Sequence, residues 1–185
     1  MTAKEKPEQK IEPITLDRLN LAFHSFGVRH GRYDFLAPNI YLEYGTEMDL
    51  MGIRKSGYID EIEIKLSRQD YRADFRKESH VRGVLTHLYT RRPIPCTWPK
   101  HEALERGLLP CNYFSFLVPE GLIDESEIPE YAGLYVYSQK RGRVEEMKKA
   151  PRLHNEKASE KTKFNVGRKM MYRYWDRVRQ QQFAA

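Results

Sequence analysis

The sequence predicts an α/β fold, a mixed β-sheet flanked by helices, and three observations support this prediction. A stretch with helical spacing of apolar residues comes first, three strand-like runs follow in succession, and a second helix begins directly after them. The chain has 185 residues, a length that suits one domain with a substantial core. We therefore expect a single α/β domain.

The first elements lie before residue 45. Residues 1–12 are charged and contain almost no apolar side chains, so they are expected to form a flexible basic tail before a domain spanning 13–185. Thr15 is placed to cap a helix whose apolar residues recur at helical spacing, and Gly27 is expected to end it. Residues 39–44 are predicted to form a short strand.

A hairpin is predicted next, with residues 55–57, Lys-Ser-Gly, as a three-residue loop whose glycine takes the left-handed position. Counting back from this loop sets Met51 opposite Glu61 and Asp49 opposite Glu63. The Cβ atoms of such directly opposed residues are roughly 4.5 to 5.5 Å apart. The turn therefore predicts the alignment of two acidic side chains.

Side-chain alternation puts Glu61, Glu63 and Lys65 on one strand face together with Glu47 and Asp49, which predicts an open polar face and an opposite apolar face. Opposed carboxylates repel each other, so something cationic must compensate. Mg²⁺ binds one or two carboxylates and completes its shell with water and phosphate oxygens. The alternative is a solvated face on which Lys65 bridges Glu47 and Glu63, and the spacing alone does not separate these two interpretations.

The second half of the chain continues the α/β order. Ser67 begins a capping-box-like signal for a helix running toward Leu88, and a Pro-rich insertion with a small helix is expected at about 91–111. Residues 113–118 are predicted to be a central, aromatic-rich strand. The remaining predicted elements are strands at 134–137 and 144–148 and a long helix at about 156–182. This helix has an apolar stripe and an opposite, exposed basic stripe, which consist of Met171, Tyr174, Trp175 and Val178, and of Lys169, Arg173 and Arg177.

Three arginines follow the predicted hairpin. Arg68, Arg72 and Arg76 recur every four residues, so on one continuous helix they would form a positive ridge beside the acidic face. Contact with DNA phosphates is the functional interpretation, because phosphate must be held close to a metal ion. A solvated helix face, with nearby aspartates as partners, is the alternative.

Composition limits the function classes. The net charge of +6 makes a polyanionic partner plausible. The cysteines, Cys96 and Cys111, form no CxxC pattern, which fits a reducing compartment and gives no sign of a zinc site. No apolar run approaches the roughly 20 residues of a membrane span. We expect a soluble, cytoplasmic protein without membrane association, and the oligomeric state stays open, a homodimer included.

One resemblance adds to this interpretation. An Asp, a hairpin and then Glu-x-Lys, here Asp49, Glu63 and Lys65, resemble the PD-(D/E)XK nuclease superfamily. The run 63–77, Glu-Ile-Lys-Leu-Ser-Arg-Gln-Asp-Tyr-Arg-Ala-Asp-Phe-Arg-Lys, is similar to the longer signature of the MmcB-like DNA-repair branch of that superfamily and of related phage proteins. The likeness extends from about residue 41 to residue 152. It takes in the segments 113–123, 128–134 and 150–152.

The resemblance implies a restriction-endonuclease-like fold and a nuclease that hydrolyses DNA with Mg²⁺ or Mn²⁺. It implies that Asp49 and Glu63 bind the metal with the Ile64 carbonyl, and that Lys65 orients or activates the attacking water. It leaves open whether Glu43 or Glu47 is the third acidic ligand. It also implies phosphate contacts for Arg152 or His154 in the stretch Pro-Arg-Leu-His. A DNA-binding accessory protein that keeps the fold without cutting is the alternative function.

Overall fold

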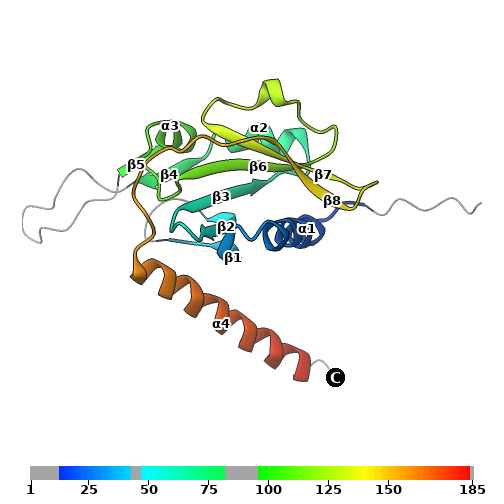
Figure 1. Ribbon diagram of the computed structural model, residues 1–185, viewed down its shortest axis with the longest axis vertical. Coiled ribbons are helices and arrows are strands. Elements are labelled where there is room, and N and C mark those ends of the chain that lie inside the picture. The colour runs from blue at the N-terminus through cyan, green and yellow to red at the C-terminus, as the bar shows by residue number, and fades with distance from the viewer. Residues whose placement is uncertain (1–12, 43–46, 82–95, 184–185) are drawn as a thin grey trace, which may run out of the picture.

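The computed structural model describes residues 13–42, 47–81 and 96–183. Its main sheet has six strands in the order β1-β2-β3-β6-β7-β8, and a second sheet pairs β4 with β5. The predicted flexible tail at 1–12 and Glu43 lie outside the described residues. The predicted fold class, a mixed α/β sheet flanked by helices, is confirmed (Figure 1).

The first helix, α1 (Leu16–Arg29), begins where the sequence predicts. Thr15 is its N-cap, and its side chain accepts a hydrogen bond of 3.2 Å from the Arg18 N–H. The predicted end at Gly27 is wrong, because the helix continues through this glycine to Arg29. Gly27 instead allows a close approach, since a Cβ there would lie 2.9 Å from the Tyr33 ring.

Three antiparallel strands follow: β1 (Tyr33–Ile40), β2 (Met48–Arg54) and β3 (Ile59–Ile64). Strand β1 begins earlier than the strand predicted at 39–44. The prediction began after Pro38, because proline interrupts a strand pattern. Here Pro38 is tolerated, since β1 is an edge strand. It pairs with β2 along most of its length. The prediction of three successive strands is therefore right in order, with a shifted first strand.

The second helix, α2 (Arg68–Asp74), is much shorter than predicted. Ser67 caps it as expected, accepting a 3.1 Å hydrogen bond from the Asp70 N–H. The chain turns after Asp74 and enters β4 (Glu78–Val81), which pairs antiparallel with β5 (Cys96–Pro99). The helix therefore does not reach Leu88, which itself lies outside the described residues.

The remaining elements complete the sheet. Helix α3 (Lys100–Glu105) matches the small helix expected in the insertion. Strand β6 (Tyr113–Pro119) runs parallel to β3 and to β7 (Ala132–Ser138), so its predicted central position is confirmed. The 3₁₀ turn η1 (Glu125–Glu127) lies between these two strands. Strand β8 (Arg143–Lys148) closes the sheet antiparallel to β7.

The two faces of the sheet are covered by different helices (Figure 1). On one face, α1 packs Leu19 and Phe23 against Ile62 of β3 and its neighbours. On the other face, side chains of α2 and α3, including Tyr71 and Leu104, pack in one core with the inward residues of β2, β3 and β6. Residues of β3 with odd numbers point to this second face, which is therefore buried under α2 and α3.

The last helix, α4 (Glu160–Phe183), starts beside β1 and then extends away from the sheet (Figure 1). Its predicted orientation is wrong. Lys169 and Arg173 of the basic stripe donate hydrogen bonds to main-chain carbonyls at the end of β1, whereas Trp175 of the apolar stripe is 54% exposed. The physical reason is that an edge strand presents unpaired carbonyls, which need donors more than they need apolar cover.

Candidate functional site

The predicted hairpin register is confirmed. The loop glycine, Gly57, has a φ of +86°, and the pairs Ile53 with Ile59 and Met51 with Glu61 are those that the turn count predicts. Continuing this register sets Asp49 beside Glu63. The Ile64 N–H, next along β3, donates a 2.8 Å hydrogen bond to Asp49 Oδ2. The two carboxylates therefore lie on neighbouring strands and on the same face.

The expectation that this face is open is wrong. Glu61, Glu63 and Lys65 are buried, with relative exposures of 1%, 0% and 2%. Helices α2 and α3 close over them, bringing Asp74 and Lys100 onto the same face. The residues that cover this face come from α2 and from α3 in the insertion. The local sequence pattern of the hairpin could not indicate them.

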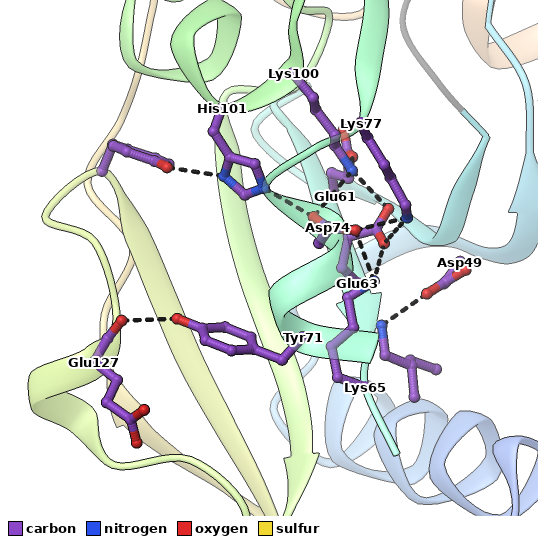
Figure 2. A network of polar contacts seen from close by, with 12 residues as sticks. Asp49, Glu61, Glu63, Lys65, Tyr71, Asp74, Lys77, Lys100, His101 and Glu127 are labelled. Carbon is purple, nitrogen blue, oxygen red and sulfur yellow. Dashed lines mark hydrogen bonds and ion pairs between the residues drawn. The ribbon is translucent and has the colours of Figure 1, made fainter. Parts of the chain in front are cut away.

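Lysines surround the Glu63 carboxylate (Figure 2). Its Oε1 atom lies 2.8 Å from Lys100 Nζ, and its Oε2 atom lies 2.8 Å from Lys65 Nζ and 3.2 Å from Lys77 Nζ. Lys100 also lies 2.9 Å from Glu61 Oε1. The cationic compensation that the opposed acids require is therefore supplied, in this structure, by lysines.

Asp74 is the second anchor of the same network (Figure 2). Its Oδ1 atom lies 2.8 Å from Lys65 Nζ and 2.6 Å from Lys77 Nζ. Its Oδ2 atom lies 2.9 Å from His101 Nε2, and His101 Nδ1 lies 2.8 Å from the hydroxyl of Tyr131. Lys65 and Lys77 thus share the same two carboxylates, those of Glu63 and Asp74.

We call the three buried acids and the three lysines the charge cluster. Its members are Glu61, Glu63, Lys65, Asp74, Lys77 and Lys100. Three carboxylates face three ammonium groups, as an ionised interior requires, since an unpaired buried charge is very costly. Lys77 differs from the other five because its side chain is 43% exposed.

The pKa shifts keep most of the cluster ionised. Burial alone would raise the pKa of Glu63, but the nearby ammonium groups of Lys100, Lys65 and Lys77 outweigh burial and lower it. The pKa of Asp74 is also lowered, because the His101 hydrogen bond and the lysines outweigh burial. For Lys65, burial is outweighed by the charges of Glu63 and Asp74, and its pKa is raised. Lys65 is therefore a permanent cation at neutral pH.

Asp49 and Glu61 behave differently. Burial, followed by the negative charge of Glu63, raises the pKa of Asp49, although the Ile64 hydrogen bond opposes this shift. The pKa of Glu61 is also raised, with burial as the main cause and Lys100 acting against it. The negative charge of Asp49 is thus less well compensated than that of Glu63.

The alternative prediction, in which Lys65 bridges Glu47 and Glu63, is half right. Lys65 contacts Glu63, but its second partner is Asp74, and Glu47 is exposed. Within residues 13–42, 47–81 and 96–183, no three His, Cys, Asp or Glu side chains are grouped so as to hold a metal ion. The third acidic ligand, predicted as Glu43 or Glu47, is therefore not found among these residues.

The donor chemistry still suits a divalent ion. Asp49 and Glu63 provide carboxylates from neighbouring strands, and hard cations such as Mg²⁺ prefer oxygen ligands. The oxygens of Glu63 are engaged by ammonium groups, so an ion would need one of them to leave. Lys77 is the candidate, because it is half-exposed and has the longer contact, 3.2 Å, with Glu63. Asp49 and Glu63 can therefore hold a divalent ion, provided that Lys77 moves away from Glu63.

The predicted arginine ridge is only partly formed. Arg68 and Arg72 lie on α2, but Arg76 follows its end, in a turn where its N–H donates to Ala73 O at 3.1 Å, so the helical spacing is broken there. Arg68 makes two hydrogen bonds of 2.9 Å to the carboxylate of Glu127. Arg72 and Arg76 are exposed.

Arg152 and His154 lie elsewhere. Arg152 donates a 3.2 Å hydrogen bond to the hydroxyl of Tyr58, at the turn end of the hairpin, roughly 17 Å along the strand from Glu63. His154 Nε2 lies 2.9 Å from Leu109 O, and its Nδ1 accepts a 3.2 Å hydrogen bond from the Glu156 N–H. These contacts give His154 a structural role, and the structure does not bring this pair together with the charge cluster.

The site residues that sequence reasoning missed are those delivered from outside the hairpin: Asp74, Lys77, Lys100 and His101. One signal could have found some of them. Strand β3 lies inside the sheet, between β2 and β6, and three ionisable side chains on one face of such a strand require buried partners of opposite charge. The next charged residues along the chain, on α2 and in the insertion, were the candidates.

Comparison with known proteins gives a fold and no function. No family model and no curated protein sequence matches the chain. Among solved structures, it is similar to SPO1766, a protein of unknown function from Silicibacter pomeroyi, with 20% sequence identity, a TM-score of 0.54 and coverage of 94% of each chain. At this identity the likeness shows the fold alone. In the described part of the chain, no helix has the length and apolarity to cross a membrane.

Proposed function

We propose that this protein is a metal-dependent nuclease that hydrolyses DNA phosphodiester bonds, with Asp49 and Glu63 as ligands of Mg²⁺ or Mn²⁺. One observation carries the proposal: the hairpin register sets these two acids on one face, with Lys65 beside Glu63 at 2.8 Å. Two acids and a lysine in this arrangement are the chemistry that the PD-(D/E)XK resemblance implies. An intracellular location, expected from two cysteines without a CxxC pattern, is part of this proposal.

The residues would divide the reaction between them. Asp49 and Glu63, with the Ile64 carbonyl, would hold the metal, which when bound polarises the phosphate and lowers the pKa of a bound water. Lys65 carries a raised pKa and stays protonated, so it acts as a fixed positive charge. It would donate a hydrogen bond to the attacking oxygen or to a phosphate oxygen, where negative charge develops. Removing a proton from water is not its role in this scheme.

Charge balance explains how the site would accept an ion. With Lys77 in place, three lysines face Glu61, Glu63 and Asp74 together with Asp49, which leaves one negative charge. When Lys77 swings out, two lysines remain against these three acids and Asp49, which leaves two negative charges. One divalent cation neutralises this remainder. Lys77, released into solvent beside the site, is then free to contact a DNA phosphate.

A second candidate is a DNA-binding accessory protein that keeps the fold without cutting. It is favoured by the complete burial of Glu63, whose two oxygens are paired with lysines without any ion. In that case the acids act as structural counterions of the lysines, and a catalytic role is not needed to explain their presence. The two candidates differ in one measurable property, metal-dependent cleavage.

The test is a cleavage assay on supercoiled, linear and single-stranded DNA with Mg²⁺, Mn²⁺ or EDTA. The wild-type protein should cut at least one substrate with metal and none with EDTA. Asp49→Asn should abolish cutting while DNA binding is kept, and Asp34→Asn, an exposed acid on the neighbouring strand β1, is the matched control. A wild-type protein that binds DNA but cuts none of these substrates would leave the accessory function in its place.

A further inference from the structure

The outer face of α4 exposes large side chains that a soluble helix normally packs inward. We call them the aromatic stripe, which consists of Phe164, Met171, Tyr172, Tyr174 and Trp175, with relative exposures of 68%, 51%, 59%, 61% and 54%. On the other side of the helix, Val166 is buried and Met170 is partly buried. An exposed apolar surface of this extent marks an interaction site.

The helix is held so that this stripe stays outside. Lys169 donates a hydrogen bond to the carbonyl of Tyr41, and Arg173 donates to those of Pro38 and Asn39. These contacts fix the opposite side of α4 against the end of β1. The stripe therefore cannot turn toward the sheet without breaking them.

The charge of α4 selects the class of partner. Between Glu160 and Phe183 the helix carries seven Lys and Arg residues and two acidic ones. Two copies of this helix would repel each other, as would any basic partner. An anionic partner is favoured by the same charges.

The kind of side chain narrows the partner further. A groove for a second helix is usually filled by aliphatic residues, whereas four of the five stripe residues are aromatic. Phe164, Arg168 and Tyr172 follow one another at helical i, i+4 spacing, and the Arg168 guanidinium lies 5.9 Å from the Phe164 ring centre. Rings alternating with guanidinium groups provide stacking surfaces for bases and cations for phosphates.

From these observations we propose that the aromatic stripe binds single-stranded nucleic acid, with bases stacked on Trp175 and Phe164 and phosphates near the neighbouring arginines. In a duplex the base faces are stacked on one another and unavailable to the stripe. Single strands therefore bind more tightly than duplexes. This binding needs no metal and no cleavage. Its test is therefore independent of the proposed nuclease activity.

The experiment measures the fluorescence anisotropy of labelled oligothymidylate, oligouridylate and a DNA duplex with the full-length protein in EDTA. Trp175→Ala and Phe164→Ala should each weaken single-strand binding by about fivefold or more, the usual effect of removing one base-stacking ring. Trp175→Phe should keep most of the affinity, while Trp175→Leu, which is apolar but cannot stack, should lose as much as alanine. Leu21→Ala, at a 68% exposed position on α1, is the control and should change nothing.

A second readout places the ligand on the stripe. In a Trp98→Phe background, Trp175 is the remaining tryptophan, and its emission should be quenched by oligothymidylate. The proposal is overturned if Trp175→Leu binds as well as Trp175→Phe, or if the stripe variants bind as well as wild type. It is also overturned if wild type binds anionic vesicles but no oligonucleotide, or if it forms a dimer in light scattering that Trp175→Ala abolishes. The DNA and RNA oligonucleotides distinguish the two sources of the same chemistry.

Discussion

The charge cluster and the aromatic stripe are opposites. In the cluster, Glu63 and Lys100 are ionised groups without any exposed surface. On the stripe, Trp175 and Phe164 are large apolar groups that are more than half exposed. Charges lie where apolar side chains usually pack, and aromatic rings lie where charges usually lie.

The two regions are therefore expected to respond differently to mutation. Burying a charge costs desolvation energy, and ion pairing offsets this cost only when the geometry is good. Exposing an aromatic ring gives up the hydrophobic stabilisation that its burial would provide. The cluster is tied into the fold by short ion pairs, so changes in it should affect stability strongly. The side chains of the aromatic stripe are mostly exposed, so substitutions there should weaken binding and leave the free energy of unfolding almost unchanged.

The largest expected effect comes from Lys100→Met. It would leave Glu61 and Glu63 without their shared cation in a buried site, and removing one partner of a buried ion pair typically costs about 3 to 5 kcal/mol. Chemical denaturation measures this loss. Lys77→Met, on the half-exposed lysine of the same cluster, is the comparison and should cost less, because the Lys77 ammonium group is already partly hydrated in the folded protein. Equal effects of the two substitutions would contradict the asymmetry that we describe.

The next effect is a dependence of stability on pH. An unfolded Asp binds a proton as the pH falls through about 3.9, whereas folded Asp74, with its lowered pKa, stays ionised. The unfolded chain then holds the extra proton, so the stability that Asp74 contributes is present above this pH and is lost as the pH falls. Its share of the slope is at most about 1.4 kcal/mol per pH unit.

Asp74→Asn should therefore flatten the acid limb of a plot of unfolding free energy against pH. Asp34→Asn, at an exposed position on β1, should leave this limb unchanged. A limb equally steep in wild type and in Asp74→Asn would mean that the ion pairs of Asp74 are not formed in solution.

A smaller effect is expected for DNA binding by α2. Arg68→Ala together with Arg72→Ala should lower the salt dependence of duplex binding by about one unit of slope for each arginine that binds a phosphate in the wild-type protein. Because Arg68 is paired with Glu127, Glu127→Gln should strengthen binding by releasing it. Anisotropy titrations at several salt concentrations measure both. An unchanged slope would place DNA away from α2.

Substitutions in the aromatic stripe should hardly change stability. Trp175→Ala should change the free energy of unfolding by no more than about 0.5 kcal/mol, the usual range for a surface substitution. The same denaturation experiment used for Lys100→Met measures it. A loss of several kcal/mol would show that Trp175 packs against the protein.

Local patterns in the sequence predicted much of the fold. The loop at Gly57 fixed the register of β2 and β3, and Thr15 and Ser67 marked the starts of α1 and α2. These signals are short-range, because a turn or a cap depends on a few adjacent residues. The alignment of Asp49 with Glu63 could be predicted for the same reason.

The cover of the site could not be predicted in this way. Lys100 meets Glu63 across 37 positions of sequence, through a short helix in an insertion that carries no periodic signal of its own. The orientation of α4 was also missed, because an apolar stripe normally packs inward, and here the carbonyls of Pro38 and Asn39 bind the opposite side. In both cases a long-range polar contact outweighed the local pattern.

We propose that Asp49 and Glu63 hold a divalent ion in place of Lys77, and calorimetric titration with Mn²⁺ measures this binding. Wild type should bind one ion saturably, and Asp49→Asn should lose this binding. Lys77→Met should bind roughly tenfold more tightly, because a competing charge within about 4 Å of the site is gone. Lys55→Met, an exposed lysine in the hairpin turn, should match wild type. A wild-type protein without saturable Mn²⁺ binding, or equal binding by wild type and Asp49→Asn, would show that these two acids do not hold the ion.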